Sequence, residues 1–472
     1  MILVAIDSEI NQPSVQYVIN TLLEDFLGLK YDLISINDYQ KDSKHLIKIY
    51  YGFDKKNEND FDLIIYSNKI WIDNYLEKDS LPSSPLQKYR NKDLLDIIDF
   101  DELPIIYSGE QKEPQKPFID YSQEKIITNV DFFASAFFML TRYEEIVNQI
   151  TDEHARFPCK KSLAYIENYL ERPIVNEYVE LLWFLLKKLQ PVLKRKEMNF
   201  QLFLTHDIDD LKLGTFKKRF RSIISQIVRK KSLRGFLSEL WRNFAWIFTL
   251  RKNTFNYILF TSEKYGFQST FYFLLNGTSK LDNRYDPYSP KVRGIIKKII
   301  EKGHKVGLHS SYSSYLDFDQ LLKEKNILKD IIDSENFGVR NHYLRIKVPE
   351  SLRNYEKANL IHDSSLGYSK CYGYRAGTCY PYYFFDILEN RKLNIKEYPL
   401  IIMELTISNN YPELDKPQKV LDAIKKQIDV ISFYKGTFVF LVHNHSLEQF
   451  QYPWRSIYKK ILGYCKIKEE QN

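Results

Sequence analysis

The sequence predicts an α/β protein, in which a smaller α/β domain precedes a parallel sheet that closes, or nearly closes, into a barrel. Three observations lead to this prediction. The chain has 472 residues, enough for two or three domains with substantial cores. Short apolar runs alternate with helical patterns, as expected of repeated β–α units. The pattern changes after a basic segment at residues 194–197, which we interpret as the linker between a domain at 1–195 and a domain at 196–472.

The first domain is expected to combine short strands with a few strong helices. Apolar residues recur three or four positions apart over residues 15–26, 129–149 and 174–189, a spacing that predicts helices, and Pro191 ends the last of them. Residues 75–125 are rich in Pro, Asp, Lys and Ser and are expected to form long loops. No glycine-rich phosphate-binding sequence is present, so no nucleotide site is predicted. Strands are expected at residues 2–6, 31–36, 46–51 and 62–66.

The second domain is expected to contain the parallel sheet. Its apolar runs are short, and helical stretches separate most of them, so a strand and the helix after it form one β–α unit. In folds of this kind the chemistry gathers at the carboxyl ends of the strands. Strands are expected at residues 200–204, 270–275, 305–308, 339–344, 396–400 and 437–442, and helices at 254–265, 290–302, 318–334, 350–359 and 416–434.

Positive charge is concentrated in one segment of the second domain. The net charge is +7, yet residues 211–252 hold twelve Lys or Arg and a single acid, Glu239. Residues 216–228 place apolar side chains on one helical face and basic ones on the other, and aromatic residues follow. We expect a basic helical insertion, which either packs on the domain or contacts an anionic membrane surface through residues 216–250. Nucleic-acid binding is not predicted, because no nucleic-acid module surrounds the charge.

The cysteines and the N-terminus bear on the compartment in which the protein works. Cysteines at positions 159, 371, 379 and 465 are scattered without a C-x-x-C pair, so neither a zinc knuckle nor a disulfide framework is expected. The first residues lack the basic start and long apolar stretch of a signal peptide, and no apolar run is long enough for a membrane span. We therefore expect a cytoplasmic protein, which associates with the inner membrane face if the insertion binds lipid.

Polar side chains gather directly after four of the predicted strands. They occur at residues 205–210 (THDIDD), 303–313 (GHKVGLHSSYS), 340–345 (RNHYLR) and 440–445 (FLVHNH). A single aspartate at such a position commonly caps a helix, and a single histidine commonly has a structural role. Carboxylates together with imidazoles, however, are ligands for a divalent metal ion. The coincidence of four clusters therefore predicts a site.

These clusters resemble, in the same order, the motifs of the NodB-type polysaccharide deacetylases, carbohydrate esterase family 4. Residues 205–209 (THDID) are similar to the D-x-D form of the first motif, and residues 303–313 to the second, G-H-E-[IV]-G-x-H-[ST]-x-x-H. Arg340 or Arg345 matches the arginine of the third motif, and residues 441–444 (LVHN) resemble the last, L-x-H-[DN]. The resemblance implies a distorted (β/α) barrel of the NodB type for the second domain.

Other stretches resemble a sub-branch of this family that carries an extra N-terminal domain. They are residues 374–378 (YRAGT) and residues 132–145 (FFASAFFMLTRYEE). Residues 362–365 (HDSS) are similar to a Y-D-S-S element of some branches, or form an ordinary turn. This resemblance implies a role in bacterial surface polysaccharide biosynthesis.

The resemblance also implies roles for single residues. Asp209 and His309 would bind a divalent metal ion, most often zinc, which polarises the N-acetyl carbonyl and lowers the pKa of a bound water. Asp207 would take the proton of that water as general base. Arg345 or Arg340 would pair with Asp207 and keep it ionised.

Four further roles complete this implied site. His443 would protonate the leaving amine, and backbone N–H groups near Tyr343, or the metal ion, would support the developing oxyanion. Arg375 would hold a carboxylate of the site or of the substrate, or would form a structural salt bridge. His304 would support the site from outside or have a structural role.

One position departs from the family pattern. The second metal histidine of the family follows the first by four residues, and Ser313 stands there in this chain. A hydroxyl is a poor replacement for imidazole on zinc. His342, at the next strand end, is the candidate replacement.

Two functions follow from the resemblance. The first is metal-dependent hydrolysis of an amide bond, namely deacetylation of an N-acetylated glycan or lipid-linked glycan, with Zn²⁺ as cofactor. The second is a catalytically impaired protein of the same type that binds glycan or scaffolds a glycan-synthesis complex. Ser313 is the reason for keeping the second.

Overall fold

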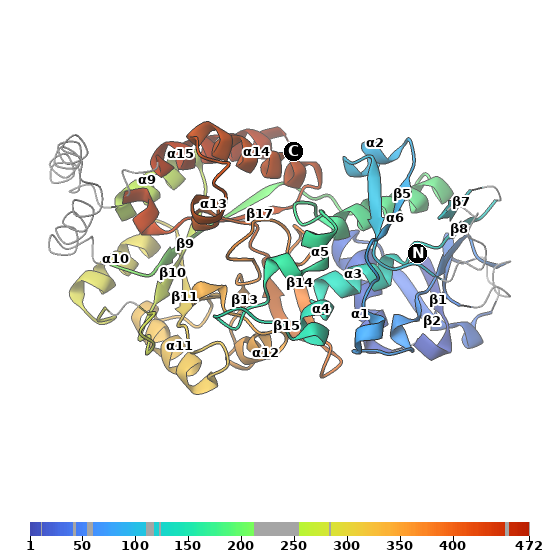
Figure 1. Cartoon of the computed structure of the whole chain (residues 1–472), viewed down its shortest axis with the longest axis horizontal. Helices are drawn as coiled ribbons and strands as arrows, with labels where there is room; N and C mark the ends of the chain where they lie inside the picture. The colour runs from blue at the N-terminus through green and yellow to red at the C-terminus, as the bar shows by residue number, and fades with distance from the viewer. Residues whose placement is uncertain are drawn as a thin grey trace. The chain divides into compact units, whose positions relative to one another are not determined.

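A computed structural model of the chain describes residues 1–10, 12–40, 44–53, 60–109, 118–121, 124–211, 254–282, 285–448 and 453–471 (Figure 1). These residues form two compact units. Unit 1 comprises Met1–Gln201, Leu344–Ile401 and Asp429–Thr437, and unit 2 comprises Leu202–Tyr343, Ile402–Ile428 and Phe438–Asn472. The first boundary lies close to the predicted linker, whereas two later segments group with unit 1. That residues 1–195 form a separate domain stays a prediction.

Unit 1 is built on a mainly parallel sheet in the order β2-β1-β3-β4-β8-β7. Its central strands are buried on both faces almost throughout, which explains why they are mostly apolar in the sequence, with half-buried Lys48 of β3 as an exception. The four predicted strands are confirmed to within one residue at either end. The strands are β1 (Ile2–Ile6), β2 (Tyr31–Ser35), β3 (Ile47–Gly52), β4 (Leu63–Tyr66), β7 (Ile119–Asp120) and β8 (Ile126–Thr128).

The single helix predicted over residues 129–149 is wrong. Two helices, α3 (Phe132–Leu140) and α4 (Tyr143–Asn148), are separated at Arg142, which adopts a left-handed φ of 55°. The buried guanidinium of Arg142 pairs with Glu144 at 2.6 Å and with Glu145 at 2.9 Å, and these contacts hold the break. The other main helices of this unit are α1 (Pro13–Asn20), continued by the π-helical turn η2 (Thr21–Phe26), α6 (Ile174–Leu189) and α12 (Glu350–Lys357).

Three more features of unit 1 differ from the expectations. Residues 75–125 contain a hairpin of β5 (Gln87–Arg90) and β6 (Glu102–Ile105) with α2 (Leu94–Ile98) between its strands. Cys159 and Cys371 form a disulfide although 212 positions separate them, a pair that the scattered cysteines of the sequence did not predict. The strand predicted at 396–400 begins earlier, as β15 (Arg391–Glu397), which pairs with β14 (Tyr382–Asp386) and β13 (His362–Asp363).

Unit 2 carries parallel strands in the order β12-β11-β10-β9-β17-β16. The order does not return to its first strand, so the closed form of the predicted barrel is excluded and the nearly closed form stays. Helices α9, α10, α11 and α15 lie around these strands (Figure 1). The strands are β9 (Gln201–Ile208), β10 (Ser269–Leu274), β11 (Lys305–Ser310), β12 (Val339–Asn341), β16 (Ile402–Met403) and β17 (Thr437–Leu441), and the helices are α9 (Thr254–Tyr265), α10 (Pro290–Glu301), α11 (Phe318–Ile332), α13 (Glu404–Asn410), α14 (Pro417–Phe433) and α15 (Trp454–Gln471).

The strand register brings the polar clusters to one edge of this sheet. Asp207 on β9 lies opposite Tyr272 on β10. His309 on β11 lies opposite Leu274 on one side and Arg340 on the other. Because all these strands run in the same direction, their carboxyl ends meet at the same edge, as the sequence predicts.

The predicted basic insertion falls outside the described residues except for Leu211, so its helix and its membrane contact stay predictions. None of the helices in the described ranges is long and apolar enough to cross a membrane.

Candidate active site

Five of the predicted site residues come together in unit 2. Nε2 of His309 lies 3.1 Å from Oδ1 of Asp209 and 3.7 Å from Oδ2 of Asp207. Nε2 of His342 lies 3.9 Å from Oδ1 of Asp209, and Nε2 of His443 lies 3.8 Å from its Oδ2. Asp209 is therefore surrounded by three imidazoles that come from three different strand ends.

The chemistry of Asp209, His309 and His342 fits a divalent metal ion. Each offers one ligand atom, and these atoms lie within 4.8 Å of one another. Oδ1 of Asp209 is buried and accepts no hydrogen bond from the described residues. Leaving such an oxygen without a partner is costly unless a cation meets it. Burial opposes ionisation of Asp209, but the three imidazoles outweigh it, and the pKa of this carboxyl lies below its ordinary value.

Each imidazole of the site is oriented through its Nδ1 atom. The partner of His309 is the carbonyl of Arg340 at 2.8 Å, that of His342 is Oδ1 of Asp282 at 2.8 Å, and that of His443 is Oε1 of Glu404 at 2.8 Å. A carbonyl and an ionised carboxylate only accept hydrogen bonds, so each Nδ1 carries the proton. In the neutral tautomer the lone pair is then on Nε2, the atom that faces Asp209.

Asp207 is held by an arginine on the neighbouring strand end. Nη1 of Arg340 lies 3.3 Å from Oδ1 of Asp207 and donates to Oγ1 of Thr205 at 2.7 Å. Arg340 is completely buried, and Asp207 is 2% exposed. A charge at this depth is stable only when it is paired, and the contact between Arg340 and Asp207 supplies that pairing. Of the two candidate arginines, Arg340 is therefore the one that lies beside the predicted base.

His443 is paired with a buried carboxylate that the sequence prediction does not include. Glu404, the first residue of α13, accepts hydrogen bonds from the backbone N–H and Nδ1 of His443 at 2.9 and 2.8 Å, and from Oγ of Ser446 at 2.6 Å. Burial alone would lower the pKa of His443, but Glu404 and, after it, Asp209 and Asp207 raise it to about 10. His443 is thus protonated at neutral pH and can give up a proton.

The backbone next to His342 is strained. Tyr343 adopts a φ of 64°, a left-handed conformation that costs a non-glycine residue about 1–3 kcal/mol. Its ring packs against His342 at 4.7 Å and against Tyr312 at 5.5 Å, between ring centroids. Strained residues of this kind persist where the surrounding contacts hold them, and they cluster at functional sites.

The other two predicted arginines lie in unit 1 and have protein partners there. Nε of Arg345 donates to the carbonyl of His154 at 2.9 Å. Arg375 is buried and makes a two-point contact with Glu145, at 2.9 and 2.6 Å. For Arg375 this geometry corresponds to the structural salt bridge that the sequence left as an alternative. Catalytic roles for both residues stay predictions.

Two more motif histidines have partners away from the metal ligands. His304 precedes β11, at the strand end opposite His309, and its Nδ1 accepts a hydrogen bond from the backbone of Ser269 at 3.0 Å. His206 is fully buried, and burial lowers its pKa to about 3, so it is neutral. Its Nδ1 lies 2.8 Å from the carbonyl of Val442, which ties β9 to the strand end of His443.

Sequence reasoning missed Asp282 and Glu404. Glu404 directly follows the short strand β16, whereas Asp282 lies further along the loop after β10, which ends at Leu274. Position directly after a strand could therefore have indicated Glu404 but not Asp282. The sequence did not show that each faces a histidine more than 35 positions away, because that contact depends on the order of strands in the sheet.

Comparisons with known proteins add little to this geometry. A family of unknown function, DUF7033, matches residues 3–191. No curated protein sequence matches significantly. Among solved structures, a Mycobacterium smegmatis protein assigned to the polysaccharide deacetylases is 12% identical over 57% of this chain and 85% of its own, with a TM-score of 0.36.

Two further solved structures are similar to the same extent. Puue allantoinase is 10% identical over 57% of this chain and 85% of its own, with a TM-score of 0.37. A mutant, with restored enzymatic activity, of a CE4 family pseudoenzyme is 10% identical over 58% of this chain and 64% of its own, with a TM-score of 0.30. At these TM-scores the similarities do not indicate a function for this chain.

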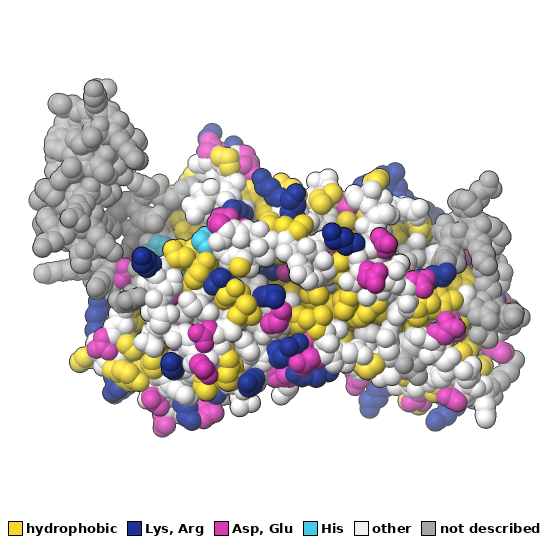
Figure 2. Space-filling view, turned by 60° about the horizontal axis from the view of Figure 1, so that its bottom comes forward, with side chains coloured by type: hydrophobic (Ala, Val, Ile, Leu, Met, Phe, Trp, Pro, Cys, Tyr) yellow, Lys and Arg dark blue, Asp and Glu magenta, His cyan; other side chains and the backbone are white. Residues whose placement is uncertain are grey.

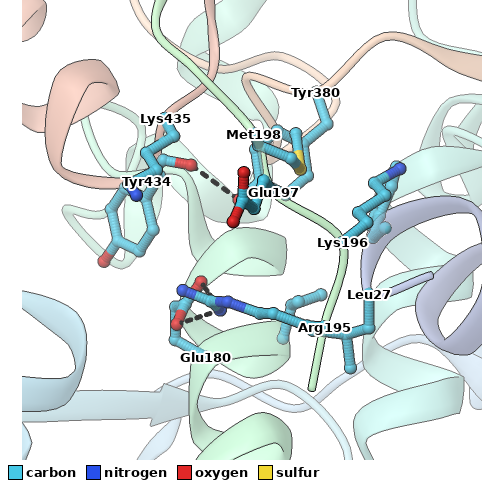
Figure 3. A pocket seen from close by; sticks show the side chains of 11 residues that line it. Leu27, Glu180, Arg195, Lys196, Glu197, Met198, Tyr380, Tyr434 and Lys435 are labelled. Atoms are coloured by element: carbon cyan, nitrogen blue, oxygen red, sulfur yellow. Dashed lines mark hydrogen bonds and ion pairs between the residues drawn. The ribbon is translucent and has the colours of Figure 1, made fainter. Parts of the chain in front are cut away.

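A cavity of about 120 Å³ lies in unit 1 and contains none of the clustered site residues (Figure 3). Nη1 of Arg195 faces it but is engaged by both carboxylate oxygens of Glu180, at 2.7 and 2.6 Å. The cavity therefore brings no reactive group comparable to those around Asp209. It is lined by Phe26, Leu27, Val179, Glu180, Arg195, Lys196, Glu197, Met198, Tyr380, Tyr434 and Lys435.

Proposed function

We propose that this protein is a zinc-dependent hydrolase that removes the acetyl group from an N-acetylated glycan or lipid-linked glycan, in bacterial surface polysaccharide biosynthesis. One observation carries the proposal. A candidate proton acceptor and a candidate proton donor flank the Asp–His–His cluster: Asp207, which is paired with Arg340 at 3.3 Å, and His443, whose pKa Glu404 raises. Amide hydrolysis needs one group of each kind. The resemblance of the four strand-end motifs to the deacetylase family names the acetamide as the substrate group.

The residues around the cluster would share the work as follows. Asp209, His309 and His342 would hold the zinc ion, which when bound polarises the carbonyl and lowers the pKa of water. Asp207 accepts the proton of the attacking water while the water oxygen forms its bond to the acetyl carbon. Nη1 of Arg340 pairs with Oδ1 of Asp207 at 3.3 Å and holds this carboxyl group in place.

His443 and Glu404 would act on the leaving group. As the carbon–nitrogen bond breaks, Nε2–H of His443 gives its proton to the departing nitrogen, and acetate and a free amine result. Glu404 stabilises the imidazolium before this step and orients the ring through Nδ1. The backbone N–H of the strained Tyr343 is the candidate donor to the developing oxyanion.

A second candidate function has one observation in its favour. Ser313 stands where the deacetylases have a metal histidine, which suits an impaired relative that binds glycan or scaffolds a synthesis complex. The position of His342 in the cluster supports the enzyme instead, because it restores a second imidazole. Nucleic acid is not proposed as a partner: basic and acidic side chains are interspersed on the described part of the face in Figure 2. Membrane contact through residues 216–250 stays part of the proposal.

The test uses the full chain loaded with Zn²⁺ and N-acetylated hexosamine oligosaccharides, with and without a lipid pyrophosphate carrier. We expect about one zinc per chain and release of acetate. Asp207→Asn should keep the zinc but lower the rate of acetate release at least ~100-fold, whereas Asp209→Asn should lose the zinc. The neighbouring carboxylate offers a matched control, Asp210→Asn, which should keep both.

Three outcomes decide between the functions. Wild-type protein that binds no zinc would overturn the metal-dependent mechanism. Acetate release by Asp207→Asn at the wild-type rate would exclude Asp207 as the base. Zinc and glycan binding without acetate release from any tested glycan would favour the impaired relative.

A further inference from the structure

A buried carboxylate outside the family motifs controls the orientation of His342. Asp282 lies in the loop after β10 and is 6% exposed. Its Oδ1 is 2.8 Å from Nδ1 of His342. Because an ionised carboxylate only accepts, Nδ1 is the donor and the lone pair of the neutral ring lies on Nε2, toward Asp209.

Asp282 is itself fixed by two chain segments. Its Oδ1 also accepts the backbone N–H of Tyr312 at 3.0 Å, and its Oδ2 accepts the backbone N–H of Ser279 at 3.0 Å. Gly277 leaves the space for it, since a Cβ there would come within 2.4 Å of the Cβ of Asp282. The carboxylate therefore has one orientation, and it transmits that orientation to His342.

The same carboxylate joins the two places where this chain departs from the deacetylase pattern. Tyr312 immediately precedes Ser313, the position of the missing imidazole. His342 is the imidazole that lies in the cluster instead, and Tyr312 and His342 both pack on Tyr343. By contrast, Nδ1 of His309 faces a main-chain carbonyl rather than a carboxylate.

We propose that Asp282 is the positioning residue that makes His342 a metal ligand in place of the absent histidine at position 313. This inference rests on the proposed function, because it presumes that the cluster binds a divalent cation. A carboxylate behind a metal-bound imidazole raises the basicity of the ligating nitrogen and fixes its direction, and removing such a partner commonly costs 10–100-fold in metal affinity.

The experiment measures Zn²⁺ affinity of the purified full chain by competition with a chromophoric chelator. We expect Asp282→Ala to weaken Zn²⁺ binding by about 10–100-fold. Asp282→Asn, which keeps the shape and one acceptor oxygen, should lose less. His342→Ala should weaken binding at least as much as Asp282→Ala, and the double variant should be no weaker than His342→Ala alone, because Asp282 acts only through this ring.

A neighbouring carboxylate provides the control. Glu324 is also buried and accepts the backbone N–H of Ser311 at 2.9 Å, but within the described residues it is not paired with a histidine. The Zn²⁺ affinity of Glu324→Gln should lie within about twofold of the wild-type affinity, because Glu324 does not orient a metal ligand. Thermal unfolding of each metal-free variant shows whether it folds. If Asp282→Ala does not fold, the near-isosteric Asp282→Asn takes its place in the affinity measurement.

The outcomes distinguish failure of the role proposed for Asp282 from failure of the proposed function. If wild-type protein binds no Zn²⁺, the proposed function fails. If wild type binds Zn²⁺ and the folded Asp282 variants bind it equally well, only the role of Asp282 is overturned. An equal loss in the His342→Ala background, or in Glu324→Gln, would show a general effect on the loop and would also overturn it.

Discussion

Replacing Glu404 with glutamine should make the protonation of His443 change between pH 6 and pH 8, where it stays almost complete in the wild type. Glu404 is fully buried and faces Nδ1 of His443 at 2.8 Å, and it is the largest influence that raises the pKa of this imidazole, from 6.5 to about 10. Glutamine keeps an acceptor oxygen for Nδ1 but removes the charge. Burial, which lowers the pKa of His443, then acts with less opposition.

The magnitude follows from the two pKa values. A fall in the pKa of His443 from about 10 to about 6.5 corresponds to about 5 kcal/mol of lost preference for the protonated ring. At pH 8 the protonated fraction would drop from nearly one to about 0.03, and at pH 6 it would still be about 0.8. The rate of acetate release should therefore fall about 30-fold at pH 8 and change little at pH 6, since only the protonated imidazole can serve the leaving amine.

Two measurements check this prediction. The pH dependence of acetate release gives the basic limb for wild type and Glu404→Gln, and NMR of Cε1-labelled histidines in the metal-free full chain gives the pKa of His443, with His443→Gln to assign its signal. Ser446→Ala is the matched control, because it removes a hydrogen bond to the same carboxylate and keeps the charge. A pKa of His443 in Glu404→Gln within one pH unit of wild type, or a loss of activity equal at pH 6 and pH 8, would refute the reasoning.

Three further changes test the buried charges. Arg340→Ala removes the arginine partner of buried Asp207, so the free energy of unfolding measured with urea should fall by about 3–5 kcal/mol; a fall of less than ~1 kcal/mol would contradict the pairing. Arg375→Met removes a partner of buried Glu145 and should cost about 3 kcal/mol while Zn²⁺ affinity stays unchanged; lost affinity at unchanged stability would instead favour a role in the site. Burial raises the pKa of Asp131 from 3.8 to about 7, so the folded state holds a proton that the unfolded state releases, and stability falls as pH rises between these values. Asp131→Asn lacks this dependence, so the Tm of the variant relative to wild type should rise from pH 5 to pH 8, and a constant difference would count against the burial effect.

The strands and most helices could be predicted from the sequence because their signals are local. Apolar runs of four to six residues marked β1, β3 and β4 to within one residue, since a strand buried on both faces is mostly apolar. The helix predicted over residues 129–149 failed for a reason that is not local. Arg142 interrupts the helix because its guanidinium pairs with two buried carboxylates. The spacing of apolar residues along the chain does not indicate such ion pairs.

The residues that form the site could be predicted from the sequence, whereas the contacts between them could not. Asp207, Asp209, His309, His342 and His443 all follow apolar runs, and parallel strands bring such positions to one edge whatever their spacing along the chain. Which arginine faces Asp207, which acids stand behind His342 and His443, and which cysteines meet all depend on strand order and on contacts between residues far apart. Those contacts are formed by packing in three dimensions, and no periodicity along the chain encodes them.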